Sequence, residues 1–116
     1  MAAVSLNTFK TIRNNVGINT VTIYTCPIGV SAIVLLAQST NLTNNSTSQI
    51  TAIHSRSIEN PTDYKFANAA YIPANDSMNL VPDGRLILET NDSIKVFASQ
   101  NNTLNIVLSI LETAKQ

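Results

Sequence analysis

Short runs of alternating hydrophobic and polar positions, separated by turn residues, make up most of the chain. The alternation is most regular over 104–110, where Leu104, Ile106, Leu108 and Ile110 stand at every second position. A period of two places these side chains on one face of a β-strand. The sequence therefore predicts a strand here with one face buried in a core.

Similar patterns predict further strands along the chain. Together with 104–110, the expected strands cover 20–26, 30–37, 49–54, 64–72, 77–81, 85–89 and 93–98. The run 30–37 is almost entirely apolar, so we expect it to be covered on both faces and to form the centre of the core. About eight short strands at this spacing predict an all-β, single-domain antiparallel β-sandwich or jelly roll.

The first 19 residues have mixed polarity and do not show this pattern. We predict an N-terminal arm over 1–19, or a short helix because Phe9, Ile12 and Val16 have helical spacing, followed by the β-sandwich domain over 20–116. The residues expected in the core are Ile33, Leu35, Ile87, Val96, Ile106 and Leu108.

One short motif occurs twice between the expected strands. Asn75-Asp76-Ser77 and Asn91-Asp92-Ser93 are each followed by an apolar–polar–apolar run. Asn tolerates left-handed backbone angles, and Asp accepts hydrogen bonds from nearby backbone amides. We therefore expect each copy to be a turn that leads into a half-buried strand.

Composition and charge exclude several classes of protein. The 116 residues carry no formal net charge, and only 12% are charged, so the basic surface of a nucleic-acid binder is missing. Asn, Ser and Thr supply roughly a third of the chain, which suits turns and exposed strand faces. No run approaches the ~18 apolar residues of a membrane helix, and the N-terminus lacks the features of a signal peptide. We expect a protein that is neither secreted by that route nor membrane-spanning.

The cysteine content agrees with a reducing site of synthesis. Cys26 is the single cysteine, so no internal disulfide can form, and we expect a packing thiol at a strand end. Asn-x-Ser/Thr triplets, for example at Asn41, Asn75, Asn91 and Asn101, follow from the composition and are not expected to carry glycans.

Few residues could take part in catalysis or bind a metal or a cofactor. His54 lies on an expected strand and is interpreted as a core or edge side chain; an enzyme would depend on it or on Glu89. The aspartates Asp63, Asp76, Asp83 and Asp92 lack the spacing of a calcium loop, and the glycines Gly17, Gly29 and Gly84 stand too far apart for a phosphate-binding loop. A carboxylate pair for glycoside hydrolysis would have to come from Glu59, Glu89 and Glu112, and their spacing suggests nothing either way. The sequence therefore predicts no catalytic residue, no cofactor and no metal.

Sugar binding stays open as an alternative. Carbohydrate sites usually present exposed aromatic rings, and Tyr24, Tyr64 and Tyr71 could supply them, although partly buried strand tyrosines are the commoner case.

Two segments follow recurrent patterns of strand and turn residues. The segment from Thr22 to Gln38 is similar to the pattern IYT-x-PxG-x-xAIVL-x-xQ. The segment from Ile72 to Val96 is similar to IPAG-x-SL-x-L-x-x-GKIVLEAGD-x-IKV, and Val107-Leu108-Ser109-Ile110-Leu111-Glu112 is similar to a closing VSVLE strand. In these segments the chain resembles small β-rich virion proteins of tailed bacteriophages, and the resemblance covers about residues 20–112. Asn75 and Asn91 replace Gly of the pattern, and Arg85 replaces Lys.

This resemblance implies a structural role and no catalytic activity. It implies a virion component, made in the host cytoplasm, that decorates the capsid and binds the major capsid protein as a symmetric homo-oligomer, with a trimer favoured. A position in the neck, tail or fibres is the nearest alternative, and a host-surface or glycan-binding module is the alternative from another class. The arm and the exposed strand edges are the expected contacts to other subunits.

Overall fold

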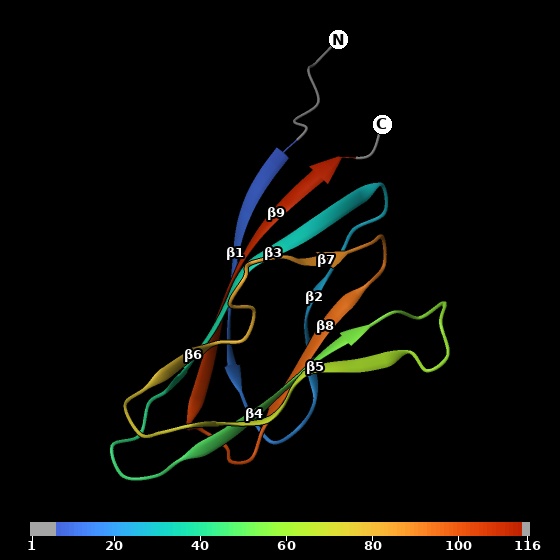
Figure 1. The fold of residues 1–116 in the computed structure, drawn as a ribbon. Helices are drawn as coiled ribbons and strands as arrows, with labels where there is room; N and C mark the ends of the chain where they lie inside the picture. The colour runs from blue at the N-terminus through green and yellow to red at the C-terminus, as the bar shows by residue number, and fades with distance from the viewer. Residues whose placement is uncertain (1–6, 115–116) are drawn as a thin grey trace.

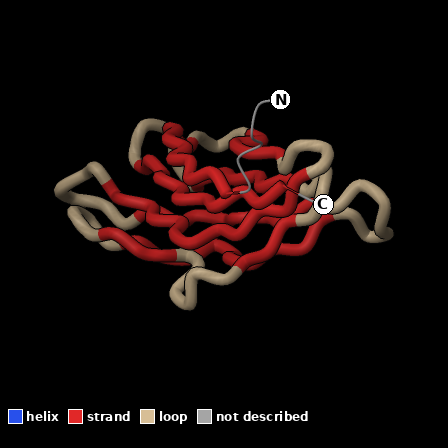
Figure 2. Tube along the Cα trace, turned by 90° about the horizontal axis from the view of Figure 1, so that it is seen from above, coloured by secondary structure: helices blue, strands red, loops and turns tan. Residues whose placement is uncertain are grey.

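Residues 7–114, the part of the chain that this computed structural model describes, form nine β-strands in two antiparallel sheets (Figure 1). The strands are β1 (Asn7–Val16), β2 (Val21–Thr25), β3 (Val30–Asn41), β4 (Ser48–Ser55), β5 (Asp63–Ile72), β6 (Ser77–Asn79), β7 (Leu86–Leu88), β8 (Ser93–Ala98) and β9 (Leu104–Ala114). The five-stranded sheet has the order β1-β9-β3-β6, with β7 also paired to β3, and the four-stranded sheet has the order β2-β8-β4-β5. The two sheets lie one above the other (Figure 2).

The strand pairs are nested along the chain. β1 pairs with β9, β2 with β8, β3 with β6 and β7, and β4 with β5. One long antiparallel hairpin gives this nesting when it is rolled into two layers, which is the jelly roll. The predicted all-β sandwich or jelly roll is confirmed.

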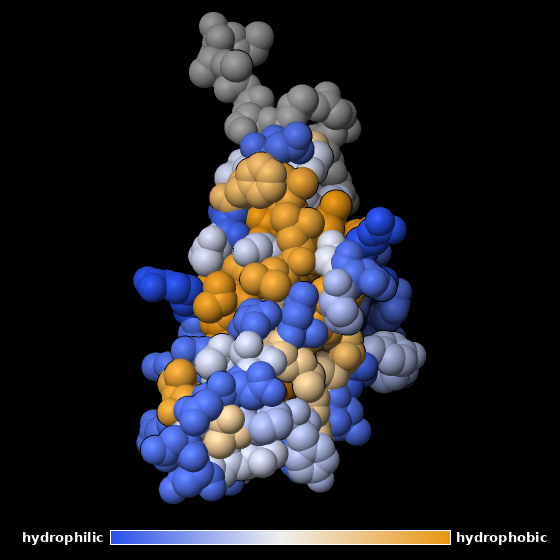
Figure 3. Space-filling view, turned by 60° about the vertical axis from the view of Figure 1, so that its left-hand side comes forward, coloured by the Kyte–Doolittle hydropathy of each residue, from blue (hydrophilic) through white to orange (hydrophobic). Residues whose placement is uncertain are grey.

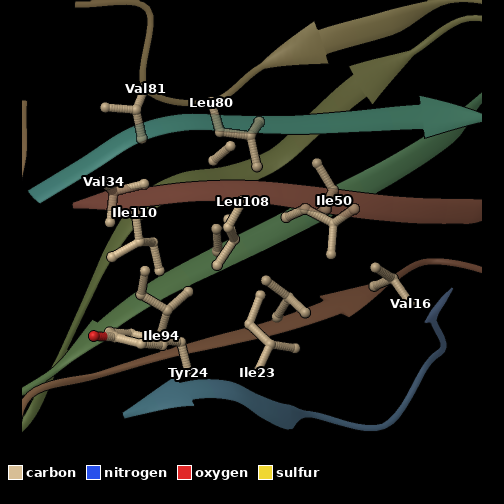
Figure 4. Close-up of a cluster of buried hydrophobic side chains, with 14 of the residues drawn as sticks. Val16, Ile23, Tyr24, Val34, Ile50, Leu80, Val81, Ile94, Leu108 and Ile110 are labelled. Atoms are coloured by element: carbon tan, nitrogen blue, oxygen red, sulfur yellow. The ribbon is translucent and has the colours of Figure 1, made fainter. Parts of the chain in front are cut away.

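The core lies between the sheets and consists mainly of branched aliphatic side chains (Figure 4). The predicted inward face of β9 is confirmed, because Leu104, Ile106, Leu108 and Ile110 are all fully buried. Inner positions of β4, β8 and β3 complete the layer. Burial of this apolar surface is the main favourable contribution to folding.

Half of the predicted core is confirmed and half is not. Val96, Ile106 and Leu108 are buried, whereas Ile33 is half-buried, Leu35 is 38% exposed and Ile87 is 58% exposed. In β7 the inward side chain is Leu88, so Ile87 between its two leucines faces outward.

The prediction that 30–37 is covered on both faces is wrong. A β-bulge interrupts the pairing of β3 with β9 between Val34 and Leu36, and Leu35 has no partner residue on β9. Val34 and Ala37 point into the core on either side of the bulge. The outer face of β3 carries apolar side chains, but no part of the described chain forms a layer over it.

The prediction of an arm or short helix at the N-terminus needs correction over 7–16. These residues form β1, which is paired with β9 along its whole length (Figure 1, blue and red). Thr and Asn are poor helix formers, and β9 offers a free edge for pairing, so the three apolar positions at helical spacing do not decide the structure. The predicted arm before Asn7 lies outside the described residues.

The two Asn-Asp-Ser turns form as predicted. Asn75 and Asn91 have φ angles of 60° and 70°, which is the left-handed conformation. Gly adopts this conformation freely and Asn tolerates it, so Asn can stand where the pattern has Gly. Asp76 accepts a hydrogen bond from the Ser77 amide at 2.8 Å, and Asp92 accepts one from the Glu89 amide at 3.0 Å. Asp76 is exposed, whereas Asp92 is buried.

Candidate functional site

A row of apolar side chains crosses the outer face of the five-stranded sheet. Phe9 on β1 lies opposite Leu111 on β9, Leu111 lies opposite Ile33 on β3, and Ile33 lies opposite Ile87 on β7. Adjacent strands are about 4.8 Å apart, so the row extends over roughly 15 Å. Residues directly opposite each other point to the same face, which makes the row continuous.

We call Phe9, Ile33, Leu35, Ile87 and Leu111 the apolar patch. Phe9 is 75% exposed, and the bulge in β3 adds Leu35 to the same outer side. Figure 3 shows a continuous apolar area in the upper half of one face of the molecule, with polar side chains around and below it. Contiguous exposed apolar surface on a folded domain marks a contact with another molecule. The patch is therefore the candidate interaction surface.

The other half of this outer face is polar. Here Asn15, Asn105, Thr40 and Ser77 lie in one row across the four strands. Gln38 donates a hydrogen bond from Nε2 to Ser77 Oγ at 2.7 Å. A shallow depression of about 330 Å³ lies beside them, lined by Arg13, Asn14, Asn15, Asn105, Ile106 and Val107. The face thus offers an apolar contact surface with amide and hydroxyl groups next to it.

Sequence reasoning missed the apolar patch because it assigned Ile33, Leu35 and Ile87 to the core. The alternation of apolar residues shows that these positions share a face, but it does not show which face the second sheet covers. The signal that could have found the patch was the long apolar run of β3. It places apolar side chains on both faces of the strand, although a strand of a two-sheet sandwich has only one face in the core.

A second cluster of polar side chains surrounds Asp92 at the start of β8. Arg56 donates to both carboxylate oxygens of Asp92, from Nε at 3.0 Å and from Nη2 at 2.8 Å. His54 Nε2 lies 2.9 Å from Asp92 Oδ2, and Arg56 also forms ion pairs with Glu59 and Glu89 at 3.2 Å and 2.8 Å. Arg56 was not singled out from the sequence.

This cluster ties three segments together through the Asp92 carboxylate. Burial raises the pKa of Asp92, but the hydrogen bonds from Arg56, the Glu89 amide and His54 outweigh it and lower the pKa to about 2. The carboxylate is therefore ionised and surrounded by donors at neutral pH. His54 and Glu89, the residues on which an enzyme would depend, both contact this structural cluster.

A third polar cluster joins the sheets near the end of β9. Tyr24 donates its hydroxyl to Glu112 Oε2 at 2.5 Å, and Lys10 Nζ lies 3.2 Å from Glu112 Oε1. Burial and the neighbouring Glu112 carboxylate raise the pKa of Tyr24 far above its usual value. Tyr24 is buried, so it is not part of an exposed aromatic platform.

The other two tyrosines do not form a compact sugar platform. Tyr64 and Tyr71 are both exposed on β5. They lie seven positions apart on this strand, which separates them by roughly 20 Å. The one thiol, Cys26, is buried, with its Sγ 3.3 Å from the Val30 carbonyl oxygen, as expected for a packing thiol.

Within residues 7–114, no group of three or more His, Cys, Asp or Glu side chains is placed to hold a metal ion. Asp63 lies 3.5 Å from Lys95, and Asp83 lines a second shallow depression beside Arg85. Over the same residues, no helix is long and apolar enough to cross a membrane.

The sequence matches no protein-family model, and no curated protein matches it significantly. Solved structures are similar in fold. A chain of the Bacillus endospore appendages, a family of disulfide-linked pili, has a TM-score of 0.53 and 9% identity over 100% of this chain and 98% of that chain. A chain of the acid-stable capsid of Helicobacter pylori bacteriophage KHP30 has a TM-score of 0.51 and 11% identity over 97% and 90%. A chain of the icosahedral IBDV particle has a TM-score of 0.53 and 10% identity, over 96% of this chain and 32% of that chain. At these identities the likeness concerns the fold.

Proposed function

We propose that this protein is a non-enzymatic structural component of a bacteriophage particle, and that it attaches to the capsid as a decoration protein. The apolar patch on the outer face of the five-stranded sheet is the observation that carries the proposal. The likeness of the fold to chains of two virus particles supports it, as does the resemblance of the sequence to small virion proteins of tailed phages.

The patch fits attachment to a protein surface by burial of apolar area. Phe9, Ile33 and Ile87 lie in one row on the same face of the sheet, so a partner can cover them together. The Asn, Ser and Thr side chains beside the patch can form hydrogen bonds at the rim of an interface. Because the chain has no net charge, many copies can stand close together with little mutual repulsion.

The partner in this proposal is the major capsid protein. A specific interface buries about 1,600 Å² in total, which is about 800 Å² from this chain. Attachment of a homo-oligomer strengthens the binding further, because a second subunit binds next to one already held.

The direct test is binding of the purified protein to particles that were assembled without it. Ile87→Asp places a charge in the patch at a position that contributes little to the core. We expect this variant to keep its thermal stability and to lose binding by roughly tenfold or more, because the carboxylate would be desolvated in the interface.

Ile58→Asp is the matched control, since Ile58 is 89% exposed in the loop between β4 and β5 and lies outside the patch. This variant should bind as the unchanged protein does. Equal binding by both variants would contradict the assignment of the patch to the capsid.

A position in the neck, tail or fibres is the second form of the same structural role. A host-surface or glycan-binding module is the competing function, and the two separate exposed tyrosines of β5, Tyr64 and Tyr71, are its candidate contact residues. That function predicts binding of the isolated domain to host cells or polysaccharide. This competing function would replace our proposal if the protein bound host cells or polysaccharide but not particles, and if Tyr64→Ala and Tyr71→Ala abolished that binding.

A further inference from the structure

Three of the four sheet edges in the described chain carry features that oppose pairing with another strand. The edge of the five-stranded sheet opposite β1 consists of β6 and β7, which have three residues each. In the four-stranded sheet, β2 has five residues and an irregular register between Thr22 and Tyr24. β5 is interrupted by two register shifts, and its Ala69 has a positive φ of 48°. Short, bulged and bent edges protect a sheet from pairing with other chains.

The fourth edge, β1, has none of these features. Its ten residues pair with β9 in an unbroken register from Asn7 opposite Thr113 to Val16 opposite Leu104. β1 has one neighbouring strand among the described residues, so one side of its backbone faces outward over 8–16. Most of its side chains are exposed on both faces, including Phe9 of the apolar patch.

Lys10 does not protect this edge. A lysine can protect an edge strand when its ammonium group lies in front of the unpaired backbone. Lys10 instead forms an ion pair with the buried Glu112 carboxylate at 3.2 Å, on the side of the neighbouring strand β9. Arg13 is the other charged residue of β1.

We propose that β1 pairs antiparallel with β1 of a second copy of this chain, across a two-fold axis at Thr11. In this register, residues that share a face lie opposite each other, as an antiparallel pair requires. Phe9 lies opposite Arg13, Lys10 opposite Ile12, and Asn7 opposite Asn15. No two cations lie directly opposite each other, and a guanidinium group can stack on an aromatic ring.

The pairing makes one continuous sheet from the five-stranded sheets of both copies. Because the axis is perpendicular to the sheet, the outer faces of the two copies point the same way, and the two apolar patches lie on one surface. The role of this double surface in capsid binding rests on the proposed function. A two-fold contact builds even-numbered assemblies, so here we expect a dimer in place of the trimer that the resemblance favoured.

Cysteine cross-linking of the full-length protein tests the contact and its register. Thr11→Cys places two thiols directly opposite each other, where the Cα atoms of an antiparallel pair are about 4.5–5.5 Å apart, a distance that a disulfide can span. We expect a disulfide-linked dimer after mild oxidation. Thr22→Cys, an exposed position on the irregular edge strand β2, is the matched control and should stay monomeric under denaturing conditions. The native Cys26 is buried and present in both.

A second variant measures the same contact without oxidation. Thr11→Lys places two ammonium groups face to face at the axis and should weaken dimerisation by roughly tenfold or more in sedimentation equilibrium. A protein that is monomeric at all concentrations, or a dimer that neither variant affects, would overturn the proposal. A dimer that does not bind particles would refute the proposed function alone, and particle binding by a monomer would refute the dimer alone.

Discussion

At the scale of single residues, Asp92 shows how a turn residue also connects its turn to the neighbouring strand of the same sheet and to the loop that follows that strand. Its carboxylate holds the turn through the Glu89 amide and joins it to β4 and the following loop through His54 and Arg56. The turn could be predicted from Asn91-Asp92-Ser93 alone. The contact with Arg56 could not, because the two residues lie 36 positions apart and meet only when β4 pairs with β8.

We predict that Asp92→Asn destabilises the fold and flattens its dependence on acid pH. The folded pKa of about 2 lies below the ordinary value of 3.8, so the carboxylate contributes stability above that value and loses it as the pH falls towards 2. This contribution is about 1–2 kcal/mol after screening by solvent. Urea unfolding between pH 2 and 6 measures it.

Asp76→Asn is the control for this experiment, because Asp76 occupies the same position of the other Asn-Asp-Ser turn but is exposed. Its unfolding should match that of the unchanged protein within about 0.5 kcal/mol at every pH. An equally steep loss of stability at acid pH in Asp92→Asn would show that other groups cause it.

Gly84 is the position where glycine is required for two reasons. Its φ is 64°, and a Cβ atom would lie 2.8 Å from the Leu35 carbonyl oxygen. We predict that Gly84→Ala lowers the free energy of unfolding by about 2–3 kcal/mol.

The control is Gly29→Ala, where φ is 79° but a Cβ would meet nothing within 4 Å. It should cost only about 1 kcal/mol for the backbone angle. Equal losses in chemical denaturation would show that the contact with Leu35 has no energetic weight.

At the scale of strands, the sequence predicts the presence of most strands and their antiparallel arrangement, but not which face of each strand is buried. Leu104 to Ile110 could be assigned to an inward face because polar or less hydrophobic residues alternate with them. In β3 and β7 both faces are apolar, and only the register of pairing and the bulge at Leu35 decide which side chains are covered. The same limit hid the apolar patch.

Leu108 and Ile87, both expected in the core from the sequence, should now differ in their contribution to stability. Leu108→Ala removes a fully buried side chain from the centre of β9 and should cost about 2–5 kcal/mol. Ile87→Ala removes a side chain that is 58% exposed and should cost less than about 1 kcal/mol. Thermal or urea unfolding of the two variants decides whether the outer face is open; similar losses would mean that it is covered in the isolated protein.

At the scale of the whole molecule, the jelly roll presents two surfaces that no other part of residues 7–114 covers, the apolar patch and the edge of β1. They meet at Phe9, which belongs to both. Whole-molecule features of this kind depend on which strands end at an edge and which face lacks a second layer. The sequence led us to expect contacts at strand edges, but the choice of edge needed the nine-strand topology.

The copy number of this chain in purified particles tests the central claim most directly. Quantitative mass spectrometry against the major capsid protein gives this number. We predict hundreds of copies per particle, close to the number of capsid subunits, because a decoration protein occupies repeated sites. A count of tens or fewer would place the protein in the neck, tail or fibres, and its absence from particles would contradict the structural role.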